Sequence, residues 1–424
     1  MQGRGPWRKA AAMDKMQAAW AGMLLAAAVL TNSTAAIAQE AAVATFEEKA
    51  DVVKGNSEFA VALYAKLQVQ QGNLFFSPYS ISTALAMTYA GARGETSRQM
   101  AEALRFAPEQ GRLHATFAAI AADVAQAGKA KGVVLHIANA LWEERGHGIL
   151  DEFRRIVKTA YGGRVEEVSF TDDAEGVRRT INEWVAEQTQ GKIRDLIGPG
   201  VLSSLTRLVL TNAIYFKGAW LSAFEQKATR DEPFWTSATD SIPVPMMNQT
   251  GRFRYAESDQ VQVLELPYAG REISMTVLLP KKKDGLAELE RGLTLDQLSG
   301  RLSGLREQKV LVQLPKFKVT SQFELRRALG ALGMTDAFCD RADFSGIDGK
   351  KDLFISAVIH KAFVDVSEEG TEAAAATAVA IGVTSIARPA PVPEFRADHP
   401  FMFLIRHVPS GTILFLGRVA NPKE

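Results

Sequence analysis

The sequence predicts an α+β fold, in which helices dominate the first half of the chain and strands dominate the second half. Apolar residues spaced three or four positions apart recur as far as residue 190, and runs of β-branched and apolar residues recur after residue 207. Helices and strands do not alternate strictly, which argues against a doubly wound parallel sheet. The 424 residues are 47% hydrophobic and 23% charged, so the chain can bury a large core.

The N-terminus has the three regions of a secretory signal peptide. Basic residues between positions 8 and 15 precede an unbroken apolar run of thirteen residues at 18–30, and Ala36-Ile37-Ala38 offers a cleavage site of small residues. The alternative is an uncleaved membrane anchor, but thirteen apolar residues are too few for a helix to span a bilayer. We therefore expect residues 1–38 to be a signal peptide and the mature protein to be secreted, with no membrane attachment.

Residues 39–424 contain no linker, repeat or low-complexity block, and we expect them to form a single domain. The formal net charge of +1 gives no basis for nucleic-acid binding. Cys339 is the only cysteine, so no intramolecular disulfide can form and the fold depends on its core. The simple cleavage site and the absence of disulfides favour a bacterial protein exported to the periplasm or the extracellular space.

The elements follow one another along the mature chain as periodic segments separated by turn residues. Helices are predicted over residues 46–67, 80–90, 97–104, 111–126, 150–161, 174–190 and 321–332. Strands are predicted over residues 73–76, 133–140, 207–215, 261–266, 273–279, 310–318, 401–406 and 412–418.

Residues 368–385 combine features of a loop and of a strand. At period two, one face carries small and β-branched side chains, namely Thr371, Ala373, Ala375, Thr377, Val379, Ile381 and Val383. Such a face fits the middle of a sheet. The segment nevertheless lies between an acidic pair with Gly370 and a proline-rich run at 389–393, which is typical of an exposed loop. The four consecutive alanines also permit a helix, but the β-branched residues from 377 to 384 argue against one. The pattern indicates a segment that changes state.

No motif for enzyme chemistry is present. The chain lacks a G-x-S-x-G elbow, an H-E-x-x-H zinc motif and a phosphate-binding loop, and its six histidines show no metal-ligand spacing. A Ser-His-Asp site built from residues distant in sequence is not excluded, but nothing in the sequence supports one, so we expect no metal, no cofactor and no catalytic site.

Several ordered blocks of the mature chain resemble those of the serpin family. The blocks are Asn73-Leu74-Phe75-Phe76-Ser77-Pro78-Tyr79-Ser80, Leu210-Thr211-Asn212-Ala213-Ile214-Tyr215-Phe216-Lys217-Gly218-Ala219-Trp220, Leu314-Pro315-Lys316-Phe317, Asp343-Phe344-Ser345-Gly346-Ile347 and His399-Pro400-Phe401. The resemblance implies a single domain of three β-sheets and about nine helices, with an exposed reactive loop at about 370–393.

The resemblance also implies a mechanism. A target serine protease, the expected partner of a monomeric inhibitor, attacks the loop and forms an acyl-enzyme. The loop then inserts as a strand into the main sheet and the protease is trapped. Two alternatives remain open: a non-inhibitory serpin that acts as a chaperone or carrier, and a trap for cysteine proteases. The small residues of the loop favour insertion, because a bulky or charged side chain would be costly to bury.

The resemblance assigns the hinge of this loop to Glu368, Gly370, Thr371, Ala373, Ala374, Ala375, Ala376 and Thr377. Counting forward from the hinge places the reactive bond between Thr384 and Ser385. Counting backward from His399 moves it toward Arg388, but Pro389 would follow, and trypsin-like enzymes cleave poorly before proline. The forward count is therefore favoured, and the small side chains before the bond suit elastase-like or subtilisin-like proteases.

The same resemblance assigns two further groups of residues, one beneath the main sheet and one where the loop enters it. Ser77, Ser80, Asn212 and His360 are expected to form a hydrogen-bonded shutter, and Trp220 and Glu368 are expected to lie in the breach, where the loop first enters the sheet. Arg326 is expected to pair with Glu368.

Overall fold

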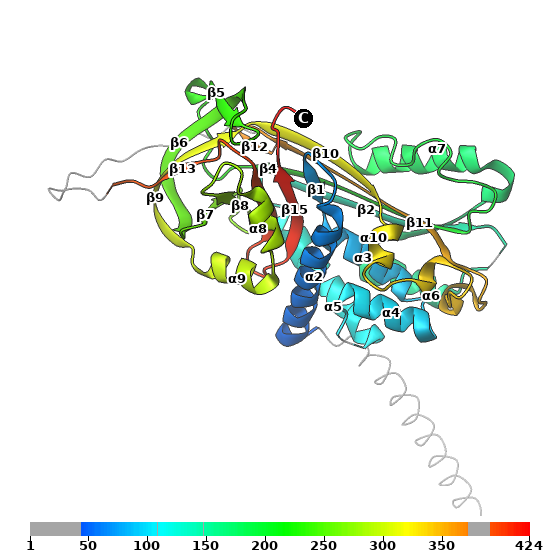
Figure 1. Ribbon diagram of the computed structural model, residues 1–424. Coiled ribbons are helices and arrows are strands. Elements are labelled where there is room, and N and C mark those ends of the chain that lie inside the picture. Colours follow the sequence, from blue (N-terminus) through cyan, green and yellow to red (C-terminus); the bar gives the residue numbers. More distant parts are fainter. Residues whose placement is uncertain (1–43, 108, 147, 372–390) are drawn as a thin grey trace, which may run out of the picture. The chain divides into compact units, whose positions relative to one another are not determined.

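The computed structural model describes residues 44–107, 109–146, 148–371 and 391–424 (Figure 1). The predicted signal peptide at 1–38 and most of the predicted loop lie outside the described residues. Within the described ranges, no helix combines the length and the apolar composition needed to cross a membrane.

Ten α-helices lie within the described residues. They are α2 (Phe46–Leu67), α3 (Pro78–Tyr89), α4 (Gly94–Leu104), α5 (Gln110–Ala127), α6 (Asp151–Tyr161), α7 (Phe170–Gln188), α8 (Leu286–Arg291), α9 (Leu295–Ser303), α10 (Arg326–Gly330) and α11 (Ser345–Asp348), with 3-10 turns η2 (Gln226–Ala228) and η3 (Asp336–Phe338). The first six match predicted helices. Two polar N-caps fix where helices begin: Thr45 forms a capping box with Glu48 before α2, and Ser77 caps α3.

The helix predicted over 321–332 is wrong in its first half. Residues Phe317–Glu324 form strand β10, and α10 begins only at Arg326. Burial alternates along β10, where Val319 and Phe323 are buried and their neighbours are not. Each residue of β10 pairs with the adjacent strand, so tertiary pairing overrides the helical spacing of the apolar residues.

A six-stranded sheet contains the site discussed below. Its order is β10, β11 (Ile355–Val366), β4 (Leu208–Ala219), β2 (Val133–Glu144) and β3 (Arg164–Val168), and the short β12 (Gly370–Thr371) also pairs with β4. Strand β4 is buried along nearly its whole length, because both faces of this sheet are covered.

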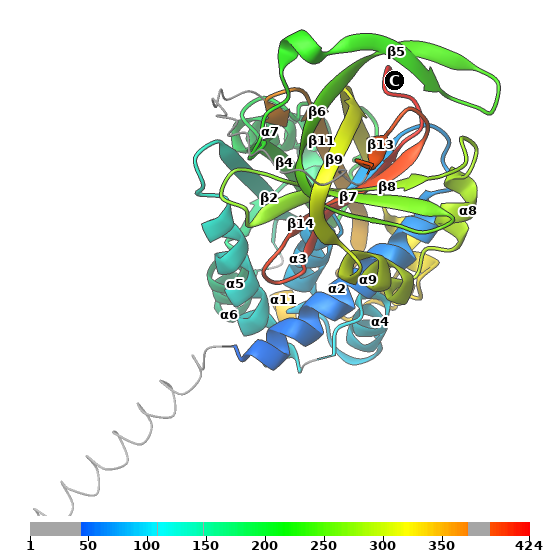
Figure 2. The ribbon, with the colours of Figure 1, turned by 90° about the vertical axis from the view of Figure 1, so that its left-hand side faces the viewer.

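A nine-stranded sheet forms the other part of the described domain. Its path is β1 (Leu74–Phe76), β15 (Ile413–Val419), β14 (Phe401–His407), β8 (Ile273–Pro280), β7 (Val261–Pro267), β6 (Ser241–Glu257), β9 (Arg306–Pro315) and β13 (Glu394–Arg396), with β5 (Arg230–Trp235) on β6. Three sheets were expected; here the second and third form one hydrogen-bonded network. The reason is β6, which pairs with β5 through its first residues and with β7 through its last (Figure 2).

Two apolar cores lie on opposite faces of the six-stranded sheet. Helix α7 covers one face, where its Ile181 and Val185 pack with Val209 and Ala213 of β4 (Figure 1). The larger core contains alternate residues of β4, such as Leu210 and Ile214, together with α2, α3 and the nine-stranded sheet. Strand β4 therefore contributes to both cores with a period of two.

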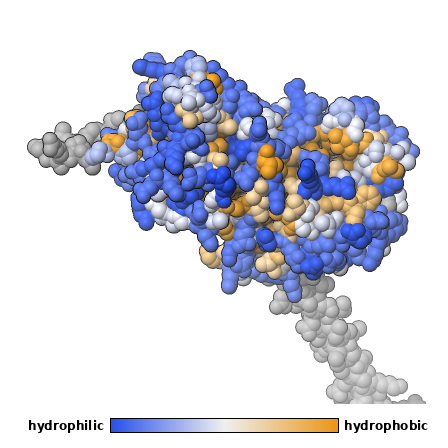
Figure 3. All heavy atoms as spheres, in the orientation of Figure 1, coloured by the Kyte–Doolittle hydropathy of each residue, from blue (hydrophilic) through white to orange (hydrophobic). Residues whose placement is uncertain are grey.

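The described surface is mostly hydrophilic on the face shown in Figure 3, with apolar residues gathered near its middle and right. The large hydrophobic side chains that remain exposed in the described ranges come from five segments, with Val201 and Leu205 in the same one: Phe46, Val69, Leu150, Val201, Leu205 and Val392. Single exposed apolar residues are normal for a folded protein and indicate no docking face.

Candidate functional site

The two central strands of the six-stranded sheet run parallel to each other. Residues Ile355 to Phe363 of β11 pair in parallel with Leu208 to Tyr215 of β4, and we call this pair the seam. The outer neighbours of both strands, β10 and β2, are antiparallel to them. A strand placed in the seam and running opposite to β4 and β11 would replace one parallel ladder with two antiparallel ladders, which are slightly more stable per residue.

Beyond the seam, β4 pairs with the hinge instead. Strand β12 runs antiparallel to β4, with Gly370 opposite Ala219 and Thr371 opposite Gly218. A tight reversal precedes it: Ser367 and Gly370 exchange backbone hydrogen bonds of 2.8 and 3.1 Å. The chain leaving β11 therefore turns back and lies along β4. We call this end of the seam, beside Gly218 and Ala219, its open end.

Gly370 is the residue that this reversal requires. Its φ is 128°, in the region that favours glycine, and a Cβ at this position would lie 2.1 Å from the carbonyl oxygen of Gly218. Any other residue would push the hinge away from β4.

Trp220 fixes the backbone just before the hinge. Its indole nitrogen donates a 3.0 Å hydrogen bond to the carbonyl of Ser367, and its backbone nitrogen donates one of 3.0 Å to the carbonyl of Glu369. The indole stacks on Tyr268 with ring centroids 4.6 Å apart. Trp220 therefore holds residues 367–369 through their backbone carbonyls, and Tyr268 packs against its indole.

Glu368 adds a charged contact at the same end. Its side chain is buried, and its carboxylate accepts hydrogen bonds from Lys316 Nζ at 2.8 Å and Thr229 Oγ1 at 2.9 Å. Burial raises the pKa of Glu368, but the hydrogen bonds from Lys316 and Thr229 outweigh this effect and the pKa lies below its ordinary value. The carboxylate is therefore ionised at neutral pH.

The expected pairing of Arg326 with Glu368 is replaced by the pairing with Lys316. Arg326 lies at the other end of β10, where its Nη2 donates a 2.7 Å hydrogen bond to the carbonyl of Phe338 and its guanidinium lies over that ring. Lys316 precedes β10, next to the hinge. It is part of the block Leu314-Pro315-Lys316-Phe317, so the sequence contained a signal for it.

His360 is the centre of a buried cluster in the middle of the seam, which we call the shutter. The backbone nitrogen of Ser77 donates to His360 Nε2 at 3.1 Å, so Nε2 accepts and the proton of the neutral ring is on Nδ1. Nδ1 donates to Asn212 Oδ1 at 2.5 Å. Burial lowers the pKa of His360 to about 3, so the ring is neutral at physiological pH.

Asn212 extends the shutter to other elements. Its amide nitrogen donates to Ser80 Oγ at 2.5 Å and to Asn139 Oδ1 on β2. Ser77 Oγ accepts from the Ser80 nitrogen and donates to the carbonyl of Leu414 on β15 at 2.6 Å. The His360–Asn212 bond crosses the seam, so a strand that enters the seam must break it.

The structure brings together the predicted shutter residues Ser77, Ser80, Asn212 and His360, and separately Trp220 and Glu368. Residues 373–377 of the hinge and the predicted reactive bond Thr384–Ser385 lie outside the described residues. Sequence reasoning missed Lys316, Thr229, Tyr268 and Asn139. No group of His, Cys, Asp and Glu able to hold a metal occurs within the described part of the chain.

Comparison of the sequence with known protein families and proteins identifies relatives over most of the chain. A family model described as "Serpin (serine protease inhibitor)" matches residues 54–422. A leukocyte elastase inhibitor of Bos taurus is 45% identical over 377 residues, covering 87% of this chain and 98% of that protein. A serpin-like protein of Thermococcus kodakarensis is 42% identical over 373 residues, covering 88% of this chain and 86% of that protein.

Solved structures give the same result for the fold. Uncleaved ovalbumin superposes with a TM-score of 0.78 at 36% identity, covering 87% of this chain and 99% of that chain. A serpin of the insect Tenebrio molitor superposes with a TM-score of 0.77 at 35% identity, covering 88% of this chain and 98% of that chain. The chain therefore belongs to the serpin family, a family of serine protease inhibitors rather than enzymes.

Proposed function

We propose that this protein inhibits serine proteases as a suicide substrate. The protease cleaves the reactive loop, forms an acyl-enzyme and is trapped when the loop inserts into the seam. The observation that carries the proposal is the pairing of Gly370 and Thr371 with β4 at the open end of the seam. These residues already run antiparallel to β4, which is the direction that an inserted strand needs.

Insertion has a favourable free energy for two reasons. The inserted strand gains ladder hydrogen bonds on both sides, and its inward face carries only small and β-branched residues. Burying Val379, Ile381 and Val383 would stabilise the inserted form by roughly 1.5–3 kcal/mol for each side chain. The uninserted protein is then kinetically rather than thermodynamically stable, with the shutter contributing to the barrier.

The proposed reactive bond is Thr384–Ser385, and the proposed targets are elastase-like or subtilisin-like proteases. Small β-branched side chains precede this bond, and relatives of Bos taurus and Sus scrofa are named leukocyte elastase inhibitors. A covalent complex with one protease molecule, formed by a monomeric inhibitor, is part of the same proposal.

We further propose that residues 1–38 direct export and that residues 39–424 are the secreted domain. The positive region, the apolar run and the small residues at Ala36 and Ala38 support this proposal. Mass spectrometry of the exported protein should find Gln39 at the N-terminus. A cell-associated protein that retains residues 1–38 would contradict it.

The test of inhibition is denaturing gel electrophoresis after the mature protein is mixed with elastase, subtilisin or trypsin. We expect a complex that survives denaturation, together with a released C-terminal peptide that begins at Ser385. Cleavage without a complex by every protease would support the non-inhibitory alternative, and a complex with a cysteine protease alone would support the other. A peptide beginning near Pro389 would move the reactive bond.

A further inference from the structure

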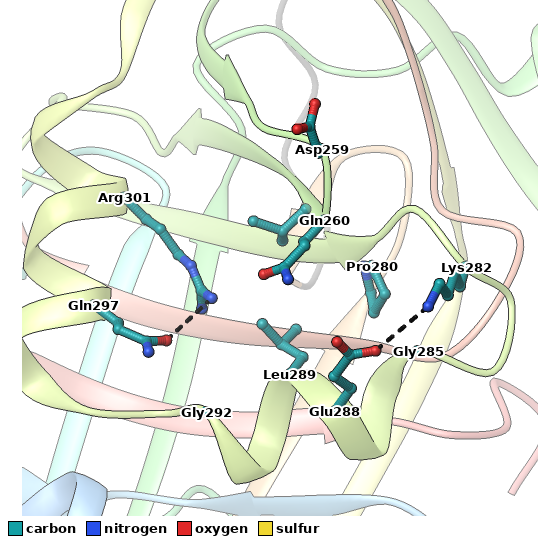
Figure 4. Close-up of a pocket in the computed structure, with 11 residues that line it drawn as sticks. Asp259, Gln260, Pro280, Lys282, Gly285, Glu288, Leu289, Gly292, Gln297 and Arg301 are labelled. Carbon is teal, nitrogen blue, oxygen red and sulfur yellow. Dashed lines mark hydrogen bonds and ion pairs between the residues drawn. The ribbon is translucent and has the colours of Figure 1, made fainter.

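A cavity of about 300 Å³ lies between the end of β8, helices α8 and α9, and the turn that joins β6 to β7 (Figure 4). All the residues that line it fall between 259 and 301, so none of them belongs to the shutter or to the hinge. Its volume is at the lower limit of small-molecule pockets in proteins. The cavity is therefore large enough for a compact organic molecule.

Arg301 is the most informative group in this cavity. Its Nη2 donates a 3.3 Å hydrogen bond to Gln297 Oε1, but its buried Nη1 has no hydrogen-bond partner among the residues that the structure describes. It also forms no ion pair with any residue of the described ranges. Burial lowers the pKa of Arg301, because no anion compensates for the loss of water around the charge. Arg301 as a whole is only partly buried, but its buried Nη1 is a donor without a partner, and such a donor costs free energy unless a ligand accepts from it.

The other charges at the cavity do not supply the missing partner. Glu288 pairs with Lys282, with 3.7 Å between Nζ and the carboxylate, and Asp259 is exposed and points away from the cavity centre (Figure 4). Figure 4 shows the head groups of Arg301 and Gln260 directed into the same space. The cavity thus presents a guanidinium and an amide to whatever occupies it.

Part of the remaining wall is apolar, and it lies beside the polar side chains of Lys282, Glu288 and Gln297. Val261 and Leu289 are 3% and 7% exposed, and Pro280 is also buried. Apolar walls favour a ligand with a hydrocarbon body, and a guanidinium fork matches the two oxygens of a carboxylate. A free phosphate would bring more charge and no apolar surface, so it fits this lining less well.

We propose that this cavity binds a small organic carboxylate. The carboxylate accepts hydrogen bonds from Arg301, the amide of Gln260 lies beside it, and the apolar body packs on Val261, Leu289 and Pro280. This site is independent of protease inhibition, because it shares no residue with the hinge, the seam or the shutter.

The test is isothermal titration calorimetry of the purified protein with sodium benzoate and sodium hexanoate, at constant ionic strength. Benzamide, which has the shape of benzoate without its charge, and sodium phosphate are the comparison probes. We expect saturable binding of at least one carboxylate, at least about tenfold weaker binding of benzamide, and a ligand-dependent rise in melting temperature.

Two variants make the result specific. Arg301→Gln should lower carboxylate affinity by about tenfold or more without lowering the melting temperature, because it removes a partly buried guanidinium whose Nη1 lacks a partner among the described residues. Arg291→Gln on α8 is the matched control, since Arg291 is exposed, does not line the cavity, and loses the same charge. Its affinity should equal that of the unmodified protein.

Three results would overturn the proposal. One is the absence of saturable binding by both carboxylates. Another is equal binding by the Arg301→Gln and Arg291→Gln variants, which would place the site elsewhere. The third is binding of phosphate in preference to benzoate and hexanoate, which would assign a different ligand class.

Discussion

The open end of the seam, around Trp220 and Glu368, and its middle, around His360 and Asn212, are held by different kinds of contact. At the open end, hydrogen bonds from the indole and the backbone nitrogen of Trp220 and an ion pair with the half-exposed Lys316 hold residues 367–369, and β12 pairs with β4. In the middle, a buried neutral network joins both strands of the seam.

Under the proposed mechanism, this difference would separate the place where insertion starts from the place where it is opposed. The contacts at the open end can persist while more of the loop is added to β4. The shutter cannot, since its His360–Asn212 bond lies across the path of the new strand. We infer that the open end sets the direction of insertion and that the shutter contributes to its barrier.

The largest effect on inhibition should come from a substitution that prevents the loop from entering the seam as a strand. Arginine in place of Ala375 lies on the face predicted to point inward, and burying an unpaired guanidinium costs on the order of several kcal/mol. The Ala375→Arg variant should therefore be cleaved but should form about tenfold less covalent complex, measured on denaturing gels.

Ala374 provides the control for this experiment, because at period two it lies on the opposite face. The Ala374→Arg variant should keep most of its complex formation. Equal behaviour of the two variants would show that the alternation does not govern insertion.

Breaking the shutter should have the next largest effect. The His360→Ala variant leaves the Ser77 nitrogen and Asn212 Oδ1 without their partner, and should lower the free energy of unfolding by about 2–4 kcal/mol. Urea denaturation measures this change. The His136→Ala variant, on the half-buried His136 of β2, should cost less than about 1 kcal/mol. Similar losses in both variants would mean that the shutter has no special role.

A third prediction concerns Glu143, which lies on β2 opposite Leu208, where the seam begins. Both of its carboxylate oxygens are buried without a hydrogen-bond partner among the described residues. Burial, with a smaller contribution from Asp348, raises the pKa of Glu143 to about 8. The native state therefore holds a proton that the unfolded state releases at lower pH.

The sign of the effect follows from this raised pKa. The stability that protonated Glu143 contributes is complete below its ordinary pKa and is lost as the pH rises through about 8. Between about pH 6 and 8, the stability of the protein should fall relative to the Glu143→Gln variant by roughly 1–3 kcal/mol. The control is Glu152→Gln on α6, where the carboxylate is exposed and the difference should not change with pH. A constant difference for Glu143→Gln would contradict the assignment.

The smallest effect is expected at the open end. The Lys316→Met variant should raise the pKa of Glu368 and cost about 1 kcal/mol or less, because Lys316 is half-exposed. Titration of Glu368 by NMR measures the shift. Arg326→Met should leave that pKa unchanged. A larger change in the pKa of Glu368 in the Arg326→Met variant than in the Lys316→Met variant would support the pairing of Arg326 with Glu368 that was expected from the sequence.

Much of the fold could be predicted from local pattern. Strand β4 is apolar over most of its length and was predicted as a strand, and the helical spacing of Phe59, Leu63 and Leu67 defined the end of α2. The prediction failed at 321–324, because pairing with β11 decides that segment and sequence spacing does not record pairing.

The site, like the fold, could be predicted from the sequence only in part. The shutter residues could be named from blocks of sequence, but their hydrogen bonds join residues up to 337 positions apart, such as Ser77 and Leu414. The choice of Lys316 over Arg326 depends on which end of β10 adjoins the hinge, which only the three-dimensional structure gives. The cavity proposed to bind a carboxylate had no motif, because its lining comes from four separate segments of the chain between residues 259 and 301.

The most direct test of the central claim, that the seam accepts the cleaved loop as a strand, is the melting temperature before and after the loop is cut. The account predicts a rise of roughly 10 °C or more, and no rise in the cleaved Ala375→Arg variant. An unchanged or lower melting temperature of the cleaved protein would contradict it, because it would mean that no strand enters the sheet.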